Sequence, residues 1–132
     1  MSYSYAQTYF PPLPALEVVL RSPGGDSLGP FPALIDTGAD MTLVPSPFLE
    51  QLSARPFSGG FLRSQWGERH PIDLFLLDFQ IADLTLPGVE VAGDQHSREV
   101  LLGRNVLNLL ILLLDGPSKT TDMLSNRPRS LR

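Results

Sequence analysis

The chain has no cysteine, and this absence removes two classes of site. Without thiols it can form neither a disulfide framework nor a thiolate metal site, so the redox state of its compartment stays open. Histidine is also scarce: His70 and His96 are the only two, and they stand isolated in the sequence. Two isolated histidines do not indicate a metal site. We therefore expect no bound metal and place each histidine in an exposed loop.

Long apolar runs and basic stretches are lacking as well. The longest apolar run is the six residues of Leu109–Leu114, against the about 20 that a membrane-spanning helix needs. The N-terminus lacks the basic region and apolar stretch of a secretory signal. We expect a soluble chain with no membrane partner and favour a cytoplasmic location. The net charge of -4, without a basic stripe, argues against nucleic acid as the main partner.

The composition is that of one globular domain. The 132 residues are 42% hydrophobic and 18% charged, which is enough apolar content for a single core. Thirteen prolines and eleven glycines between short apolar runs favour many short strands joined by turns, hence an all-β fold. We expect an N-terminal arm over 1–15, the domain over 16–117 and a polar tail over 118–132. Most of that tail is expected to be disordered, with Thr120–Leu124 as an alternative interface strand.

Two motifs stand far apart in the sequence. The first, Asp36-Thr37-Gly38-Ala39-Asp40, directly follows the apolar run Ala33–Ile35. The second, Leu102-Gly103-Arg104-Asn105, directly follows another apolar pair. In this order the two motifs resemble those of the retropepsin-like aspartic proteases, and the resemblance extends roughly from Leu16 to Asp115. It implies a small closed β-barrel of the retropepsin type, homodimeric, with a flap hairpin and one or two short helices.

The resemblance implies that Asp36 is catalytic. The chain holds a single Asp-Thr-Gly, so a two-aspartate site would need one Asp36 from each subunit of a homodimer. Two carboxylates about 3 Å apart cannot both ionise and therefore share one proton. One then acts as the base that activates water, and the other as the acid. This chemistry needs no metal or organic cofactor.

The neighbours of Asp36 are expected to support the active-site loop. Because Gly38 has no side chain, its N–H can lie beside the Asp36 carboxylate. The resemblance implies that the Thr37 hydroxyl bonds across the dimer axis. Ala39 completes this loop.

The resemblance also implies a pair between Asp40 and Arg104 inside one subunit, with Asp40 touching the substrate main chain. A guanidinium can bind a carboxylate through two parallel N–H bonds. The alternative is an ordinary surface pair of little energetic weight. Leu102, Gly103 and Asn105 of the second motif are expected to lie behind the active-site loop and hold it.

The remaining pattern predicts short elements around these motifs. We expect a hairpin of Leu16–Leu20 and Phe31–Ile35 around the turn Ser22–Asp26. A helix over Ser46–Leu52 should have Ser46 as its N-cap and Pro47 as its first residue. Further strands are expected over segments with alternating or short apolar runs: Ile72–Phe79, Ile81–Leu86 and Val89–Val91, the last two separated by a turn at Pro87–Gly88.

The last part of the domain should contain a polar loop, a helix and a strand. The loop is expected over Gly93–Glu99. The helix Gly103–Leu110 would place Val106, Leu107 and Leu110 on one face. The strand Ile111–Leu114 is apolar on both faces, which indicates either core or a dimer interface.

The flap is expected over Phe57–Glu68, with its tip near Trp66 and Gly67. The candidate tip residues are Ser64, Gln65, Trp66 and Gly67. The alternative interpretation is a plain surface hairpin whose tryptophan packs on the barrel.

The sequence thus favours a homodimeric aspartic endopeptidase that acts on a peptide or protein substrate. An extended peptide with apolar side chains flanking the cut would suit a cleft beneath a flap. Two alternatives stay open: a retropepsin-like fold acting as a non-catalytic dimerisation or peptide-binding module, and an unrelated small β-barrel binder in which Asp-Thr-Gly is only a turn. The second alternative does not account for the Leu-Gly-Arg-Asn motif.

Overall fold

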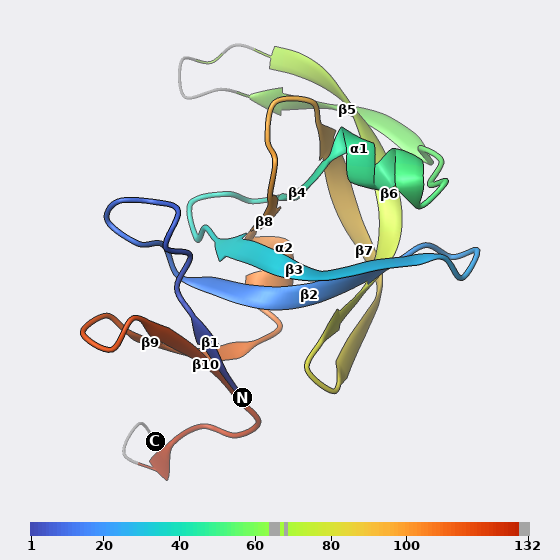
Figure 1. The fold of residues 1–132 in the computed structure, drawn as a ribbon. Helices are drawn as coiled ribbons and strands as arrows, with labels where there is room; N and C mark the ends of the chain where they lie inside the picture. Colours follow the sequence, from blue (N-terminus) through green and yellow to red (C-terminus); the bar gives the residue numbers. More distant parts are fainter. Residues whose placement is uncertain (64–66, 68, 130–132) are drawn as a thin grey trace.

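Strands close into a barrel in the computed structural model, which describes residues 1–63, 67 and 69–129 (Figure 1). Within this described part, six strands form the ring, and β2 pairs with β6 to close it. In ring order they are β2 (Ala15–Arg21), β3 (Ser27–Ile35), β8 (Val100–Leu102), β4 (Thr42–Pro45), β7 (Leu84–Asp94) and β6 (Arg69–Ile81). A further strand, β5 (Ser58–Arg63), pairs with β6 and extends beyond the ring.

Alternating apolar side chains fill the barrel. Along β2, Leu16, Val18 and Leu20 are buried while Glu17 is exposed, because successive side chains of a strand point to opposite faces. Phe79 and Val91, on neighbouring strands, are fully buried in the same core cluster. Each such side chain contributes about 1.5–3 kcal/mol by its burial. The core therefore gives the loops at the barrel's end a rigid support.

The β2–β3 hairpin confirms the prediction for the start of the domain. Its turn is closed by two hydrogen bonds, from Ser22 N–H to the Asp26 carbonyl and from Gly25 N–H to the Ser22 carbonyl, both 2.9 Å. The turn leads into β3, which ends at Ile35, immediately before Asp36.

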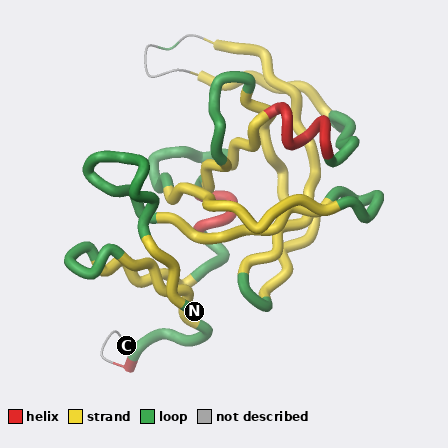
Figure 2. The backbone as a smooth tube through the Cα atoms, in the orientation of Figure 1, coloured by secondary structure: helices red, strands yellow, loops and turns green. Residues whose placement is uncertain are grey.

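Both predicted helices are present but shorter than expected (Figure 2). Helix α1 spans Ser46–Gln51, and its N-cap is Pro45, not Ser46, because Pro45 has extended backbone angles (φ -54°, ψ 134°) and no side-chain cap bond forms. Helix α2 spans only Arg104–Leu107, with Gly103 as its N-cap. After α2 the backbone forms two hydrogen bonds of the 3₁₀ type, from Leu109 N–H to the Val106 carbonyl and from Leu110 N–H to the Leu107 carbonyl. Strand β9 then begins at Ile111.

The predicted turn at Pro87–Gly88 is wrong, because β7 continues through these residues. The reversal lies earlier, at Ala82–Asp83. At Pro87–Gly88 the register with β6 shifts, and Gly88, with φ +62°, donates its N–H to the Asp78 carboxylate at 2.9 Å. A β-bulge tolerates proline and glycine as well as a turn does. The strand also continues to Asp94, which shortens the predicted polar loop.

The two ends of the described chain meet in a second, three-stranded sheet (lower left in Figure 1). Its order is β1 (Ser2–Ser4), β10 (Thr120–Leu124) and β9 (Ile111–Asp115). Part of the predicted arm is therefore a strand, and Thr120–Leu124 pairs within its own chain. None of the helices in the described residues is long and apolar enough to cross a membrane.

Candidate active site

The fold brings the two sequence motifs side by side. Strand β3 runs parallel to β8, with Ile35 opposite Leu102, and Asp36 donates its N–H to the Leu102 carbonyl at 3.1 Å. Asp36 is half-buried at the point where β3 ends. A residue aimed by a rigid strand into a loop is well placed for chemistry.

The loop after β3 folds back on the Asp36 carboxylate. Gly38 N–H donates to Asp36 Oδ1 at 2.9 Å, which is the contact expected of this glycine, and Ala39 N–H donates to the Asp36 carbonyl at 3.2 Å. A Cβ at position 38 would lie 3.2 Å from Oδ1, so a side chain there would press on the carboxylate. Thr37 is exposed at the outer end of the loop.

Arg104 ties α2 to the same loop. Its backbone N–H donates to the Ala39 carbonyl at 2.8 Å, and its Nη1 donates to the Thr37 carbonyl at 2.9 Å. In the part of the chain that the structure describes, no ion pair joins Arg104 to Asp40. This differs from the pair that the resemblance implied, because the guanidinium reaches a loop carbonyl while Asp40 is exposed to solvent.

A buried polar network supports the loop from behind. Thr42, which is fully buried, accepts the Gly103 N–H at 3.1 Å and donates its hydroxyl to Asn105 Oδ1 at 2.7 Å. Asn105 Nδ2 in turn donates to the Glu90 carbonyl of β7 at 2.8 Å. Asn105 and Gly103 were expected to support the loop from their place in the second motif, whereas Thr42 was not. The available signal was one hydroxyl in the otherwise apolar run Met41–Val44.

Gly103 lies against the backbone of the first motif. A Cβ built on it would be 2.5 Å from both the carbonyl carbon and the carbonyl oxygen of Met41. Real Cβ atoms do not approach other atoms so closely, so only glycine fits here without movement of the backbone. The second motif is therefore fixed to the first by close packing as well as by hydrogen bonds.

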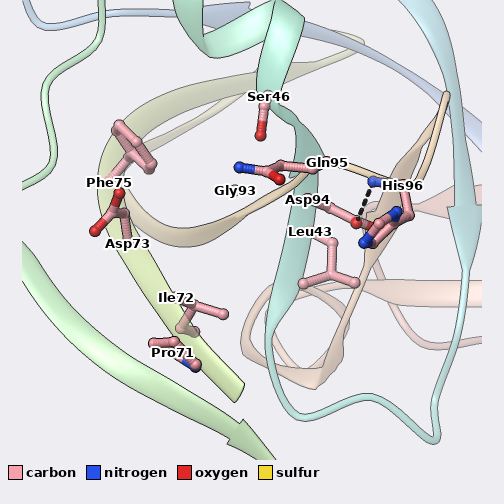
Figure 3. Close-up of a pocket in the computed structure, with 10 residues that line it drawn as sticks. All are labelled: Leu43, Ser46, Pro71, Ile72, Asp73, Phe75, Gly93, Asp94, Gln95 and His96. Carbon is pink, nitrogen blue, oxygen red and sulfur yellow. Dashed lines mark hydrogen bonds between the residues drawn. The ribbon is translucent and has the colours of Figure 1, made fainter.

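A cavity of about 680 Å³ lies between the base of the β5–β6 hairpin, β4, α1 and the loop after β7 (Figure 3). The apolar side chains of Leu43, Ile72 and Phe75 form much of its wall, and the Ser46 hydroxyl and the Gln95 amide point into it. The other lining residues are Pro71, Asp73, Gly93, Asp94 and His96. This cavity has no signature in the sequence, because its wall is assembled from three separate segments, 43–46, 71–75 and 93–96.

The predicted flap coincides with the β5–β6 hairpin. Its register runs from Ser58 opposite Leu74 to Arg63 opposite Arg69. Of the candidate tip residues, Ser64, Gln65 and Trp66 lie outside the described residues. Gly67 is described; it is exposed and has φ +83°, in the region that glycine adopts most readily.

The described residues contain no group of three or more His, Asp or Glu side chains arranged to hold a metal ion. At the end of β3 stands one half-buried carboxylate, whose Oδ1 accepts the backbone N–H of Gly38. A carboxylate so held can act as an acid or a base toward a group that approaches the loop.

No family model and no curated protein matches this sequence. Solved structures do resemble it. The solution structure of the simian foamy virus (mac) protease is 26% identical, with a TM-score of 0.52, over 71% of this chain and 91% of that one. A retropepsin-like aspartic protease from Rickettsia conorii is 10% identical, with a TM-score of 0.64, over 93% and 88%. The EIAV protease in complex with the inhibitor HBY-793 is 17% identical, with a TM-score of 0.54, over 80% and 92%.

Proposed function

Because this chain has a retropepsin-like fold, we propose that it is an aspartic endopeptidase whose active site is completed by a second copy of the chain. The observation that carries the proposal is the placement of Asp36. Its carboxylate stands at the end of β3, in a loop bonded to the Leu-Gly-Arg-Asn segment through Leu102 and Arg104. A single chain supplies one such carboxylate.

In the proposed mechanism, two Asp36 carboxylates share one proton across the dimer axis. The ionised member takes a proton from a water molecule as the water oxygen attacks the carbonyl carbon of the scissile peptide. The protonated member donates a hydrogen bond to the carbonyl oxygen, on which negative charge develops. In each copy the Gly38 N–H would hold Oδ1, which leaves Oδ2 to face the water or the other carboxylate.

The edge of the terminal sheet supports pairing with a second copy. Strand β9 is an edge strand of that sheet, and Leu113 and Leu114, which alternate between its two faces, are each 47% exposed. Leu109, just before the strand, is 62% exposed. An apolar edge strand tends to pair with another chain. In Figure 1 this sheet and the loop after β3 project toward the same side of the barrel.

The proposed substrate is an extended peptide. The cavity beside the β5–β6 hairpin has room for a large side chain, and its apolar walls favour apolar groups near the cut. Cleavage of a peptide library should show this preference. Selection of charged residues on both sides of the cut would contradict it.

The deciding experiment compares wild type with Asp36→Asn on a mixed peptide library from about pH 3 to pH 8, which covers the acid to near-neutral conditions that favour a dyad sharing one proton. Circular dichroism and sedimentation must show that the variant keeps its fold and its dimer. Loss of cleavage in such a variant supports the dyad, whereas equal cleavage by the variant refutes it. Wild-type dimers that cleave nothing at any pH would favour a non-catalytic peptide-binding or dimerisation module.

Dilution gives an independent test of the shared site. If two chains form one site, activity per chain must fall at concentrations where the dimer dissociates. Constant specific activity of a demonstrated monomer would refute the two-chain site.

A further inference from the structure

A side-chain hydrogen bond links the N-terminal arm to the connection between β7 and β8, whose first residues line the cavity. The Tyr9 hydroxyl donates to Glu99 Oε2 at 2.5 Å. Tyr9 lies in a loop of the arm whose base is closed by an isolated bridge, with hydrogen bonds of 2.7 and 3.2 Å between the backbones of Ala6 and Leu13. The tyrosine is therefore presented by a closed loop and not by a free end of the chain.

Glu99 ends the short connection between β7 and β8, which we call the wall loop (residues 95–99). The wall loop supplies Gln95 and His96 to the cavity (Figure 3). His96 N–H donates to Asp94 Oδ1 at 2.9 Å, and the Ser97 hydroxyl both accepts the Glu99 N–H at 3.2 Å and donates to the Glu99 carbonyl at 2.8 Å.

These bonds make the wall loop two consecutive turns, each closed by a side chain. Such turns allow Glu99 and the residues that face the cavity little movement relative to one another. A restraint on the Glu99 side chain therefore restrains the whole wall loop, including Gln95.

The Tyr9–Glu99 contact has the character of a strong hydrogen bond. A hydroxyl donor 2.5 Å from an acid oxygen lies at the short end of the range for charge-assisted bonds. In agreement, this bond and the nearby negative charge raise the pKa of Tyr9. The Tyr9 hydroxyl therefore keeps its proton, and remains a hydrogen-bond donor, up to a higher pH than an ordinary tyrosine.

We propose that Tyr9 is a positioning residue that holds the wall loop in place, so that the N-terminal arm determines how the Gln95 amide meets a substrate side chain in the cavity. Tyr9 itself lines no part of that cavity. The effect on substrate selection rests on the proposed protease function, but the ordering of the wall loop does not.

Amide hydrogen exchange tests the ordering directly, without any activity. In Tyr9→Phe, the His96 and Glu99 amides should exchange about fivefold faster than in wild type, the effect of losing one hydrogen bond. The matched control is Tyr3→Phe, which removes a hydroxyl from the same arm, where it donates to Met1 Sδ and not to the wall loop. Glu99→Gln keeps an acceptor for Tyr9 and should give intermediate rates. Exchange in Tyr9→Phe within about twofold of wild type would overturn the proposal.

Peptide kinetics test the effect on selection. For peptides whose side chain hydrogen-bonds in the cavity, Tyr9→Phe should raise KM about fivefold while kcat changes by less than about twofold. An equal rise in KM for Tyr3→Phe, or a loss confined to kcat, would contradict the positioning role. If no protein cleaves any peptide while the exchange result holds, the protease function fails and the ordering role of Tyr9 stands.

Discussion

Replacing Gly103 with alanine should destabilise the protein more than the addition of one methyl group suggests. The new Cβ would lie 2.5 Å from two backbone atoms of Met41 and 3.0 Å from a third, its backbone nitrogen. All three are main-chain atoms, so no flexible side chain can move aside to relieve the contact. One of the two segments must therefore shift, and both belong to the candidate active site.

The expected cost follows from two contributions. Forcing an extra carbon into a closely packed site costs about 1–3 kcal/mol. A shift of position 103 also weakens the 3.1 Å bond from its N–H to the Thr42 hydroxyl, which contributes about 1 kcal/mol. Alanine restricts the unfolded chain and returns roughly 0.5 kcal/mol or more. The net loss in the free energy of unfolding should be about 2–3 kcal/mol, with a fall in Tm of about 8–12 °C for a domain of this size.

Urea denaturation of Gly103→Ala beside Gly116→Ala measures this effect. A Cβ at position 116 meets nothing within 4 Å, so this control gains the same restriction of the unfolded chain without the collision. Its free energy of unfolding should equal that of wild type or exceed it by up to about 1 kcal/mol. Equal stability of the two variants would refute the packing argument. If Gly103→Ala folds, its cleavage rate should fall as well, because Asp36 is bonded to the adjacent Leu102.

Three further predictions concern side chains that hold or flank the site. Thr42→Val should lower the free energy of unfolding by about 2 kcal/mol, because the Gly103 N–H and Asn105 Oδ1 lose their hydrogen-bond partner. The control is Thr121→Val, since the buried Thr121 hydroxyl has no partner among the described residues. It should be neutral or stabilising in the same urea titration. Arg104→Lys should lower stability by about 1 kcal/mol through loss of the guanidinium bond to the Thr37 carbonyl, and unchanged melting and activity would contradict that role. The hydrogen bond to the Glu99 carboxylate raises the pKa of Tyr9 above its usual 10.0. The stabilising effect of this bond should therefore be intact below pH 10.0 and be lost as the pH rises through the raised pKa. A phenolate absorbance titration of wild type against Tyr9→Phe checks this, and ionisation of Tyr9 at its usual pKa would contradict it.

Local sequence pattern was sufficient to predict much of the framework. The apolar run before Asp36 indicated a strand that ends at the site, and β3 does end at Ile35. The resemblance to the retropepsin-like family implied that the second motif would lie behind the first, and β3 and β8 do lie side by side. The Ser22–Asp26 turn was also predicted, because its signal lies within the segment itself. Most of the tail was expected to be disordered, with Thr120–Leu124 only as an alternative interface strand, whereas the structure pairs this segment with β1 and β9 of its own chain.

Features that depend on tertiary packing could not be predicted in this way. Pro87–Gly88 has the composition of a turn, and only pairing with Asp78 on β6 makes it a bulge. Thr42 bonds to residues 61 and 63 positions away in the sequence, and Tyr9 bonds to a residue 90 positions away. A local pattern cannot indicate partners at such separations. The second helix ends early because the chain must turn into β9, whose pairing lies in the terminal sheet.

The contact between distant motifs also constrains when the proposed active site can form as the protein is synthesised. The Asp36 loop obtains its anchoring bonds from Leu102, Gly103 and Arg104, and β1 obtains its pairing from β10. A ribosome has therefore completed β3 long before the segments that fix its loop have emerged. Contacts of such long sequence separation form late and slowly. A nascent chain that ends before residue 102 would hold Asp36 in an unsupported loop, so the proposed active site could not form until the second motif has been synthesised.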